Sequence, residues 1–313
     1  MFDFFDTILT PLYYFVSAIM VGWHWVFEHL GLPEDSGWTW LATIIGLTIT
    51  IRAMLIPLFV KQIKSSRNMQ LLQPQVKELQ KKYGHDREKL AQEQMKLFKE
   101  TGTNPLSSCM PLLLQMPIFF ALFRVIDHAA NGEARGVLSP EQARSIEDAQ
   151  FLGAHIADRF IDGDTSIKII TATMVIVMCA TTFMTQRQLM SKNMPASAMT
   201  GQYAQTQKLM LYVLPFVFAI GGVAFPIGVL MYWVTSNLWT MSQQFWVIRN
   251  NPAPGTPAAE AKKKRDEAKG KGPATVTTTE PSGTSTATEP AAPKRQQPKS
   301  QSRKNRKGGG GKK

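Results

Sequence analysis

Long uncharged stretches fill most of the first 252 residues of this 313-residue chain, and polar segments separate them. A helix of about 20 apolar residues can cross the hydrocarbon core of a bilayer. The pattern therefore predicts five transmembrane helices, at about residues 38–60, 105–126, 167–186, 209–225 and 227–248. The last two come from one uncharged run that Gly221, Gly222 and Pro226 interrupt at its middle. Such a pattern excludes a simple soluble domain and indicates an all-α integral membrane protein.

A further apolar stretch, residues 7–27, leaves two interpretations open. It is long enough to span a bilayer, but residues 1–6 contain two Asp and no base, which is a poor cytoplasmic end for a first helix. Its tyrosines and tryptophans are typical of a membrane interface. We therefore expect residues 1–37 to form an external helix that lies in the membrane surface, with an extra transmembrane helix as the alternative.

The segment 61–103 predicts a cytoplasmic helical hairpin. Apolar residues such as Met69, Leu72 and Val76 recur in it at helical spacing, and a second apolar series follows a break at residues 84–86. The sequence leaves two roles open for this apolar stripe. It seals the two helices against each other, or it also meets membrane headgroups or a partner protein.

The distribution of charge predicts the orientation, because Lys and Arg near span ends favour the cytoplasmic side. Segment 61–103 has ten Lys plus Arg against five acids, and segment 187–208 has three basic residues and no acid. Segment 127–166 reverses the balance, with three Arg and eight acids. We expect the first two segments to be cytoplasmic and the third to face outward. The N-terminal side of a five-helix core then lies outside, and the C-terminal tail lies in the cytoplasm.

The composition of the tail differs from that of the rest of the chain. From Ala253 to Lys313 there is no Leu, Ile, Met, Phe, Tyr or Trp, and residues 249–313 have sixteen Lys plus Arg against five acids. This segment cannot bury enough apolar surface to fold alone, so we predict a disordered basic tail. Its basic clusters are candidates for contact with RNA or anionic lipid through charge alone, without sequence-specific readout of nucleic acid. They comprise Lys262, Lys263, Lys264, Arg265, Arg303, Lys304, Arg306 and Lys307.

Arg52 is the only charged residue well inside the predicted spans. An arginine at the centre of a membrane helix costs about 2.5 to 3.5 kcal/mol, so it needs a water-filled cavity or a buried partner. No Asp or Glu occurs in the five spans to pair with it, and Val60, at the cytoplasmic end of the span, is only eight residues away. The sequence therefore predicts a hydrophilic pocket around Arg52 that opens toward the cytoplasm.

Polar residues in the spans are candidates for the lining of this pocket. Thr48 lies one helical turn from Arg52 on the same face. Gln115 lies in the second predicted span, and Asn237, next to Ser236, lies in the fifth. A hydroxyl can instead bond back to its own helix, and an amide can join two helices. Both alternatives stay open.

The residues do not indicate catalytic, metal or cofactor chemistry. The two cysteines, Cys109 and Cys179, fall in apolar stretches, which argues against a disulfide framework or a zinc site. No Walker-type glycine-rich loop, catalytic triad or cluster of metal ligands is visible in the sequence. We therefore expect no cofactor, no metal and no enzymatic reaction.

Three segments of the chain resemble the YidC membrane protein insertase family, the bacterial relatives of the mitochondrial Oxa proteins. They read TITIRAMLIPLFVKQIKSSRNMQLLQP, KYGHDREKLAQEQMKLFKETGTNPLSSCMPLLLQMPIFFALFRV and FPIGVLMYWVTSNLWTMSQQ, and the resemblance covers about residues 38–248. It implies five core helices around a hydrophilic groove that opens to the cytoplasm and to lipid but is closed toward the outside. Arg52 matches the arginine of that groove, and Thr48, Tyr232 and Trp233 match positions along the path of the incoming chain.

The resemblance also implies a function. A member of this family is expected to move short polar segments of nascent membrane proteins through the groove and to release the hydrophobic helix into lipid, alone or with the Sec translocon. Members with long basic tails use them to hold the ribosome. The sequence shows neither the large extracytoplasmic domain of Gram-negative members nor the lipobox of many Gram-positive ones, so it resembles an actinobacterial-type member in the bacterial plasma membrane.

Two other classes of membrane protein are alternatives to an insertase. An ion-coupled transporter normally uses intramembrane carboxylates and inverted repeats, and neither occurs in this sequence. A membrane scaffold or assembly chaperone without insertase activity stays open from the sequence, and the resembled family combines insertion with assembly.

Overall fold

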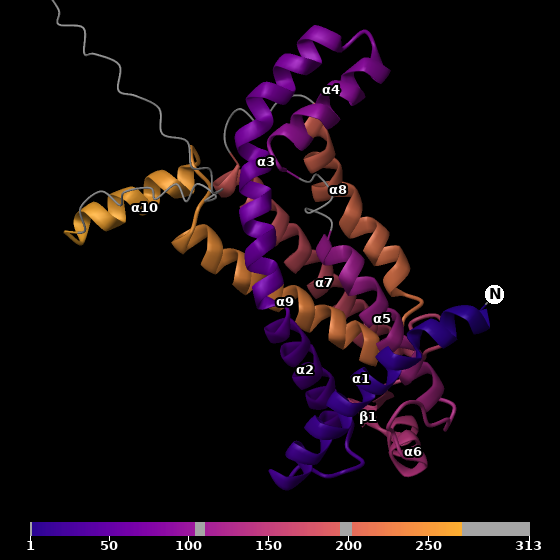
Figure 1. Ribbon diagram of the computed structural model, residues 1–313. Helices are drawn as coiled ribbons and strands as arrows, with labels where there is room; N and C mark the ends of the chain where they lie inside the picture. The colour runs from indigo at the N-terminus through magenta and orange to yellow at the C-terminus, as the bar shows by residue number, and fades with distance from the viewer. Residues whose placement is uncertain (1, 104–109, 195–201, 271–313) are drawn as a thin grey trace, which may run out of the picture. The chain divides into compact units, whose positions relative to one another are not determined.

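The computed structural model describes residues 2–103, 110–194 and 202–270, and its elements are almost all helices (Figure 1). Two short strands, β1 (Gln150–Phe151) and β2 (Ala154–His155), pair antiparallel. The expected helical fold class is confirmed at this level, and the strand pair is an addition that the sequence pattern does not predict. The helices are α1 (Phe2–His29), α2 (Gly37–Met54), α3 (Ile56–Tyr83), α4 (Arg87–Glu100), α5 (Met110–Ala129), α6 (Pro140–Asp148), α7 (Thr165–Asn193), α8 (Gln202–Gly222), α9 (Ile227–Asn250) and α10 (Pro257–Ala268).

Helices α2 and α3 follow each other with only Leu55 between them and differ in direction by 51°. Pro57 explains the bend, because it has no N–H to donate to the carbonyl of Ala53 and its ring clashes with the helix backbone one turn earlier. Helix α3 continues without a break through residue 61, the predicted boundary between span and hairpin, and the position of that boundary stays a prediction. The first arm of the hairpin is α3, which begins inside the predicted first span.

The hairpin consists of α3 and α4, which pack against each other. Asp86 caps the start of α4 by accepting a hydrogen bond from the backbone N–H of Lys89 at 3.0 Å. Leu72 and Val76 of the apolar stripe are buried, which fits the sealing role. Leu71, beside them in the sequence, is exposed.

The largest hydrophobic cluster joins α1, α2 and α5 with part of α9. Tyr13, Val16 and Met20 are the buried contribution of α1, whereas Tyr14 and Trp25 of the same helix are exposed. Helix α1 thus buries one face against the bundle. This one-sided burial is compatible with both interpretations of residues 1–37.

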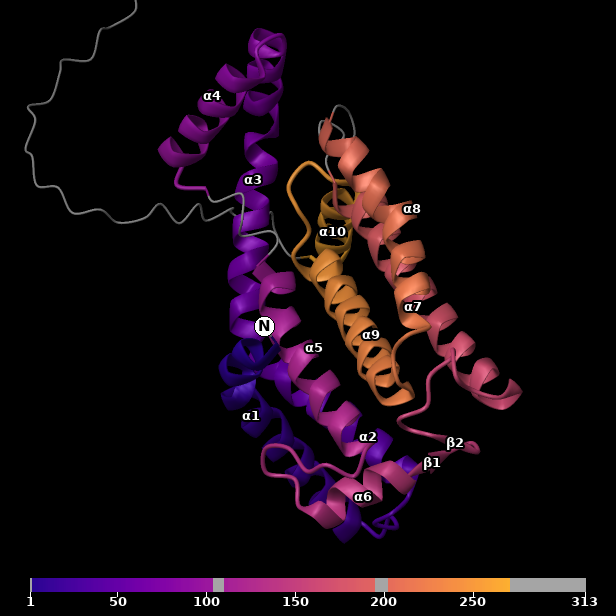
Figure 2. The ribbon, with the colours of Figure 1, turned by 90° about the vertical axis from the view of Figure 1, so that its right-hand side faces the viewer.

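Helix α9 packs against α7 and also against α2, and α8 packs on α7 (Figure 2). Helices α2 and α9 run parallel, since Ile44 lies against Gly228 and Arg52 bonds to Ser236, eight residues further along each helix. This register brings the last turn of α2 to the middle of α9.

Residues 130–164, between α5 and α7, pack onto one end of the bundle. Nε1 of Trp40 on α2 donates to Oγ of Ser145 on α6 at 2.9 Å. The backbone N–H of Gly228, at the start of α9, donates to the carbonyl oxygen of Ile156 at 3.0 Å. The acidic segment is therefore a folded cap over the first turns of α2 and α9.

The prediction of a disordered tail from residue 249 is wrong for its first part. Helix α9 continues to Asn250, and α10 follows and packs against α7 and α9. The first part of the tail has no hydrophobic core of its own and folds against α7 and α9 instead, since Ala253 and Ala258 are buried. The backbone N–H of Ala253 also donates to Oδ1 of Asn193, at the end of α7, at 2.8 Å. The prediction for residues 271–313 lies outside the described residues.

Length and apolar composition alone identify few membrane spans among the described residues. Helix α7 passes as one, and α2 with residues 56–63 passes if the bent pair counts as a single span. The apolar part of α8, residues 207–222, is shorter. Helices α5 and α9 carry polar side chains such as Gln115 and Asn237, which lower their average hydropathy. The arrangement with five spans stays a prediction.

Candidate functional site

Arg52 occupies the last turn of α2, just before the bend, and is partly buried. Its Nε donates a hydrogen bond to Oγ of Ser236 on α9 at 3.0 Å, and a second guanidinium nitrogen donates to the same oxygen. No Asp or Glu of the described residues forms an ion pair with it. A neutral hydroxyl therefore holds the guanidinium, and no carboxylate neutralises its charge.

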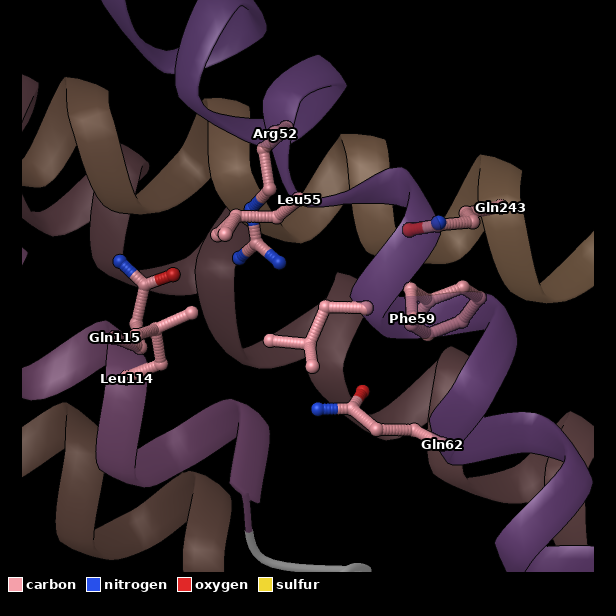
Figure 3. A pocket seen from close by; sticks show the side chains of 8 residues that line it. Arg52, Leu55, Phe59, Gln62, Leu114, Gln115 and Gln243 are labelled. Atoms are coloured by element: carbon pink, nitrogen blue, oxygen red, sulfur yellow. The ribbon is translucent and has the colours of Figure 1, made fainter.

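A small hollow of about 30 Å³, here called the polar hollow, opens beside Arg52 between α2, α3, α5 and α9 (Figure 3). Figure 3 shows the guanidinium of Arg52 pointing into the space that Gln115 and Phe59 border. Three amide side chains and the guanidinium alternate with apolar groups around it. The lining residues are Arg52, Leu55, Leu58, Phe59, Gln62, Leu114, Gln115 and Gln243.

A second hollow of about 280 Å³, the aromatic hollow, shares Arg52 and Gln115 with the first and lies between α5, α8 and α9. The ring of Trp233 meets the rings of Phe119 and Phe218 edge-on, with centroids 5.3 and 4.8 Å apart. Arg52 thus lies at the border between the lining with amide side chains and the lining with aromatic rings. The other lining residues are Met116, Phe119, Phe120, Phe218, Phe225, Tyr232, Trp233, Ser236 and Asn237.

Gln115 and Tyr232 connect α5 to α9 at the border of the two hollows. The side-chain amide of Gln115 donates a hydrogen bond to the hydroxyl of Tyr232, which is buried. Both residues are candidates from the sequence, and both lie at the site. This bond uses one N–H of the Gln115 amide and the oxygen of Tyr232 as acceptor, so it does not engage the amide oxygen of Gln115 or the O–H donor of Tyr232.

The other candidates from the sequence differ in where they lie. Trp233 and Asn237 line the aromatic hollow. Nδ2 of Asn237 also donates to Oγ1 of Thr182 on α7 at 3.0 Å, so this amide joins two helices as well. Thr48 lines neither hollow, because it is 1% exposed and its hydroxyl donates to the carbonyl oxygen of Ile44 at 2.7 Å. The hollows begin only where α2 bends, and Thr48 lies one turn earlier, in the packed part of the helix.

The basic candidates of the tail are divided between α10 and the residues that are not described. Lys263 and Lys264 are exposed on α10, and Lys262 is partly buried. Arg265 donates to the backbone carbonyl of Arg249 at 2.7 Å and so caps the end of α9. Arg303, Lys304, Arg306 and Lys307 lie outside the described residues. Within the described part of the chain, no group of three or more His, Cys, Asp or Glu side chains could hold a metal ion.

Sequence reasoning does not identify all residues of this site. It treats Ser236 only as a neighbour of Asn237, although Ser236 lies four residues after Tyr232 and so shares its helix face. Phe119 and Phe218 carry no such signal, because an apolar ring in a membrane helix can equally face lipid. Their role follows only from the packing of α5, α8 and α9.

Comparisons with known proteins agree on one family. The family model described as 60Kd inner membrane protein matches residues 31–254. A membrane protein insertase YidC from Streptomyces avermitilis is 46% identical over 260 residues, which cover 80% of this chain and 60% of that protein. A membrane protein insertase YidC from Tropheryma whipplei is 37% identical over 282 residues, which cover 85% of this chain and 91% of that protein.

A solved structure, titled as an active YidC insertase crystal structure with the first transmembrane domain resolved, is also similar. It is 26% identical with a TM-score of 0.47, and the match covers 77% of this chain and 46% of the other. The chain therefore spans less than two thirds of the Streptomyces relative and about half of the crystallised protein.

Proposed function

The chain belongs to the YidC family of membrane protein insertases, as its motifs suggest, and from this premise we propose that it inserts nascent proteins into the bacterial plasma membrane. The observation that carries the proposal is the position of Arg52. Its charge has no carboxylate partner among the described residues, and it lies between a polar hollow and an aromatic one. This arrangement offers one surface to a polar segment and another to an apolar helix.

The polar hollow lowers the cost of moving a short polar segment across the membrane. An unpaired charge in hydrocarbon costs several kcal/mol, and a hollow with amide side chains shortens the distance over which that cost applies. Arg52 gives an acidic or polar segment a temporary partner. Ser236 keeps the guanidinium oriented toward the hollow without neutralising it.

The aromatic hollow provides the path for the hydrophobic helix of the substrate. It lies between α5 and α8, and the apolar side chains Phe216 and Ile220 on α8 are largely exposed. An apolar helix that passes Trp233 can leave into lipid between these helices. Partition of that helix into hydrocarbon supplies the free energy. The process involves no covalent step and no nucleotide hydrolysis, so the protein acts as an insertase and assembly chaperone rather than as an enzyme.

The proposed topology has five spans, with the N-terminal side outside and the tail in the cytoplasm. It places the acid-rich cap, residues 130–164, on the outer face and the hairpin of α3 and α4 on the inner face. The basic residues of α10 and of the following tail then face the ribosome and anionic headgroups. The Sec translocon is a further proposed partner for substrates with several spans.

Reconstituted vesicles test the role of Arg52. The substrate is a single-span protein with an acidic external tail, and the same protein with an uncharged tail is the control substrate. We expect Arg52→Ala to lower insertion of the acidic substrate by about tenfold, the equivalent of about 1.4 kcal/mol, and Arg52→Lys to lower it less. The matched control variant is Lys208→Ala, which removes an exposed base. Equal insertion of the acidic substrate by Arg52→Ala and the unmodified protein would disprove the electrostatic role.

A further inference from the structure

The strand pair of β1 and β2 carries an apolar side chain at its tip. Phe151 and Ala154 pair across the strands, so Leu152 and Gly153 form the two-residue turn between them. Leu152 has a φ of 54° and Gly153 one of 85°, and among the described residues Leu152 is the only one other than glycine with a positive φ. A two-residue turn with positive φ at both positions favours Asn, Asp or Gly at the first. A leucine there strains the backbone, and its side chain is 64% exposed.

The base of the strand pair is fixed to the bundle. A methyl group at Gly37, the first residue of α2, would collide with the backbone carbonyl of Gln150, so β1 lies directly on the start of that helix. The backbone N–H of His155 donates to Oδ2 of Asp158 at 2.7 Å. The next residue, Ile156, accepts the hydrogen bond from the start of α9. The position of the tip therefore follows from the positions of α2 and α9.

Trp38 places this base at the edge of a predicted span. It is the second residue of α2 and is 57% exposed, and tryptophan is enriched where a span meets the membrane surface. Its ring meets the ring of Phe151 edge-on, with centroids 4.6 Å apart. Phe151 and Leu152 thus extend the exposed aromatic surface that begins at the end of α2.

The direction of the strand pair keeps its tip close to the membrane surface. Figure 2 shows the pair extending sideways from the end of the bundle at which α7 begins. Helix α7 passes as a membrane span by length and apolar composition, and Ile169, near its start, is 62% exposed. A hairpin that continued along the axis of the bundle would carry Leu152 into water. A sideways hairpin carries it over the lipid that surrounds the span.

We propose that the strand pair anchors the acid-rich cap, residues 130–164, in the headgroup region of the membrane. Leu152 is immersed there, and Trp38 and Phe151 lie beside it at the edge of the span. A lipid surface fits this patch better than a partner protein, because three side chains are too few for a stable protein interface and the patch adjoins a span. The leaflet is the outer one in the proposed topology, whereas immersion itself does not depend on insertase activity.

Spin labels test the immersion of the tip. The full chain without Cys109 and Cys179 is labelled with a nitroxide at Leu152→Cys and reconstituted in vesicles of phosphatidylglycerol and phosphatidylethanolamine. The control is Glu141→Cys, an exposed position of the same cap. We expect the ratio of collisions with oxygen to collisions with a water-soluble nickel chelate to be several-fold higher at residue 152 than at residue 141. Equal ratios would overturn the proposal, and spin–spin broadening at residue 152 would assign the patch to a second copy of the chain instead.

Tryptophan quenching tests the same anchor with Leu152 in place. The signal of Trp38 is the difference between the unmodified chain and Trp38→Phe, both in vesicles that contain brominated lipids. We expect bromines near the glycerol to quench this signal more than bromines near the chain ends. Leu152→Asn suits the turn but removes the apolar tip, so it should weaken that quenching and increase quenching by aqueous iodide. Circular dichroism verifies that this variant is folded.

Two results of the quenching experiment would contradict the anchor. One is stronger quenching of Trp38 by iodide than by lipid bromines in the unmodified chain. The other is unchanged quenching in Leu152→Asn, which would show that the tip makes no contact with lipid. Neither result changes the insertion assay for Arg52, so failure of the anchor and failure of the insertase function are distinguishable.

Discussion

Arg52 could be identified from the sequence because the cost of a charge in an apolar span is a local property of the chain. Its partner could not be identified, because the bond to Ser236 depends on the parallel register of α2 and α9, which the sequence does not reveal. Thr48, by contrast, is a candidate from the sequence that lines neither hollow in the structure. It shares a helix face with Arg52, but the bend after Met54 separates a packed face from an open one within a single turn.

Ser236 should act as a positioning residue for Arg52. Ser236→Ala removes the only hydrogen-bond partner that the described residues show for the guanidinium, so Arg52 becomes free to turn toward water. We expect a loss of about 1 kcal/mol, or about fivefold in the insertion of an acidic-tailed substrate, and no loss for an uncharged-tailed one. Thr240→Ala, one turn further on α9, is the control. An equal loss for both substrates would indicate a structural effect instead.

Gly46 should be intolerant of a side chain. The ring of Trp23 on α1 lies over it, and a methyl group at residue 46 would come within 2.5 Å of that ring. The ring cannot move freely, since Nε1 of Trp23 donates to Oγ1 of Thr50 at 2.8 Å. We expect Gly46→Ala to destabilise the protein by about 1 to 3 kcal/mol in thermal unfolding in detergent. Gly22→Ala, where no atom lies within 4 Å of the added methyl group, should be neutral or stabilising.

At the scale of elements, the helices inside the predicted spans follow from the length of the uncharged stretches, whereas their junctions depend on tertiary contacts. Helix α3 runs through the predicted boundary at residue 61 because helix propensity continues past the last apolar residues into its charged arm. Helix α10 could not be predicted from composition, since Ala253 and Ala258 become buried only against α7 and α9. A segment with too few apolar residues to fold alone can thus fold against neighbouring helices.

The docking of α10 should control the protease sensitivity of the tail. Trypsin can cut at Lys262 to Arg265 only after local unfolding of α10. Ala258→Asp places a charge at a buried position, so we expect cleavage in this cluster to become about tenfold faster or more. Asn193→Ala, which removes the acceptor for the N–H of Ala253, should have a smaller effect in the same direction. Ala261→Asp adds the same charge at an exposed position of α10 and should leave the rate unchanged.

At the scale of the whole molecule, charge and packing together distinguish the two ends of the bundle. The acid-rich segment 130–164 covers the first turns of α2 and α9, and the polar hollow lies toward the last turns of α2, where the chain continues into the basic hairpin. The sequence could predict this polarity because charge is local to each segment. It could not predict that the acidic segment folds as a cap, because Trp40 and Ser145 are 105 residues apart.

Cysteine labelling tests the proposed topology and also decides between the two interpretations of α1. In a variant without Cys109 and Cys179, a single cysteine is introduced at Asp3, Glu141 or Ala261 and treated with a membrane-impermeant maleimide. Glu141→Cys should react in intact cells, and Ala261→Cys should react only after permeabilisation, because residue 141 lies in the acidic cap and residue 261 in the basic tail. An external α1 makes Asp3→Cys react like Glu141→Cys, whereas an extra span makes it react like Ala261→Cys. Reaction of Glu141→Cys only after permeabilisation would contradict the whole orientation, since the charge excess on the two sides would then be reversed.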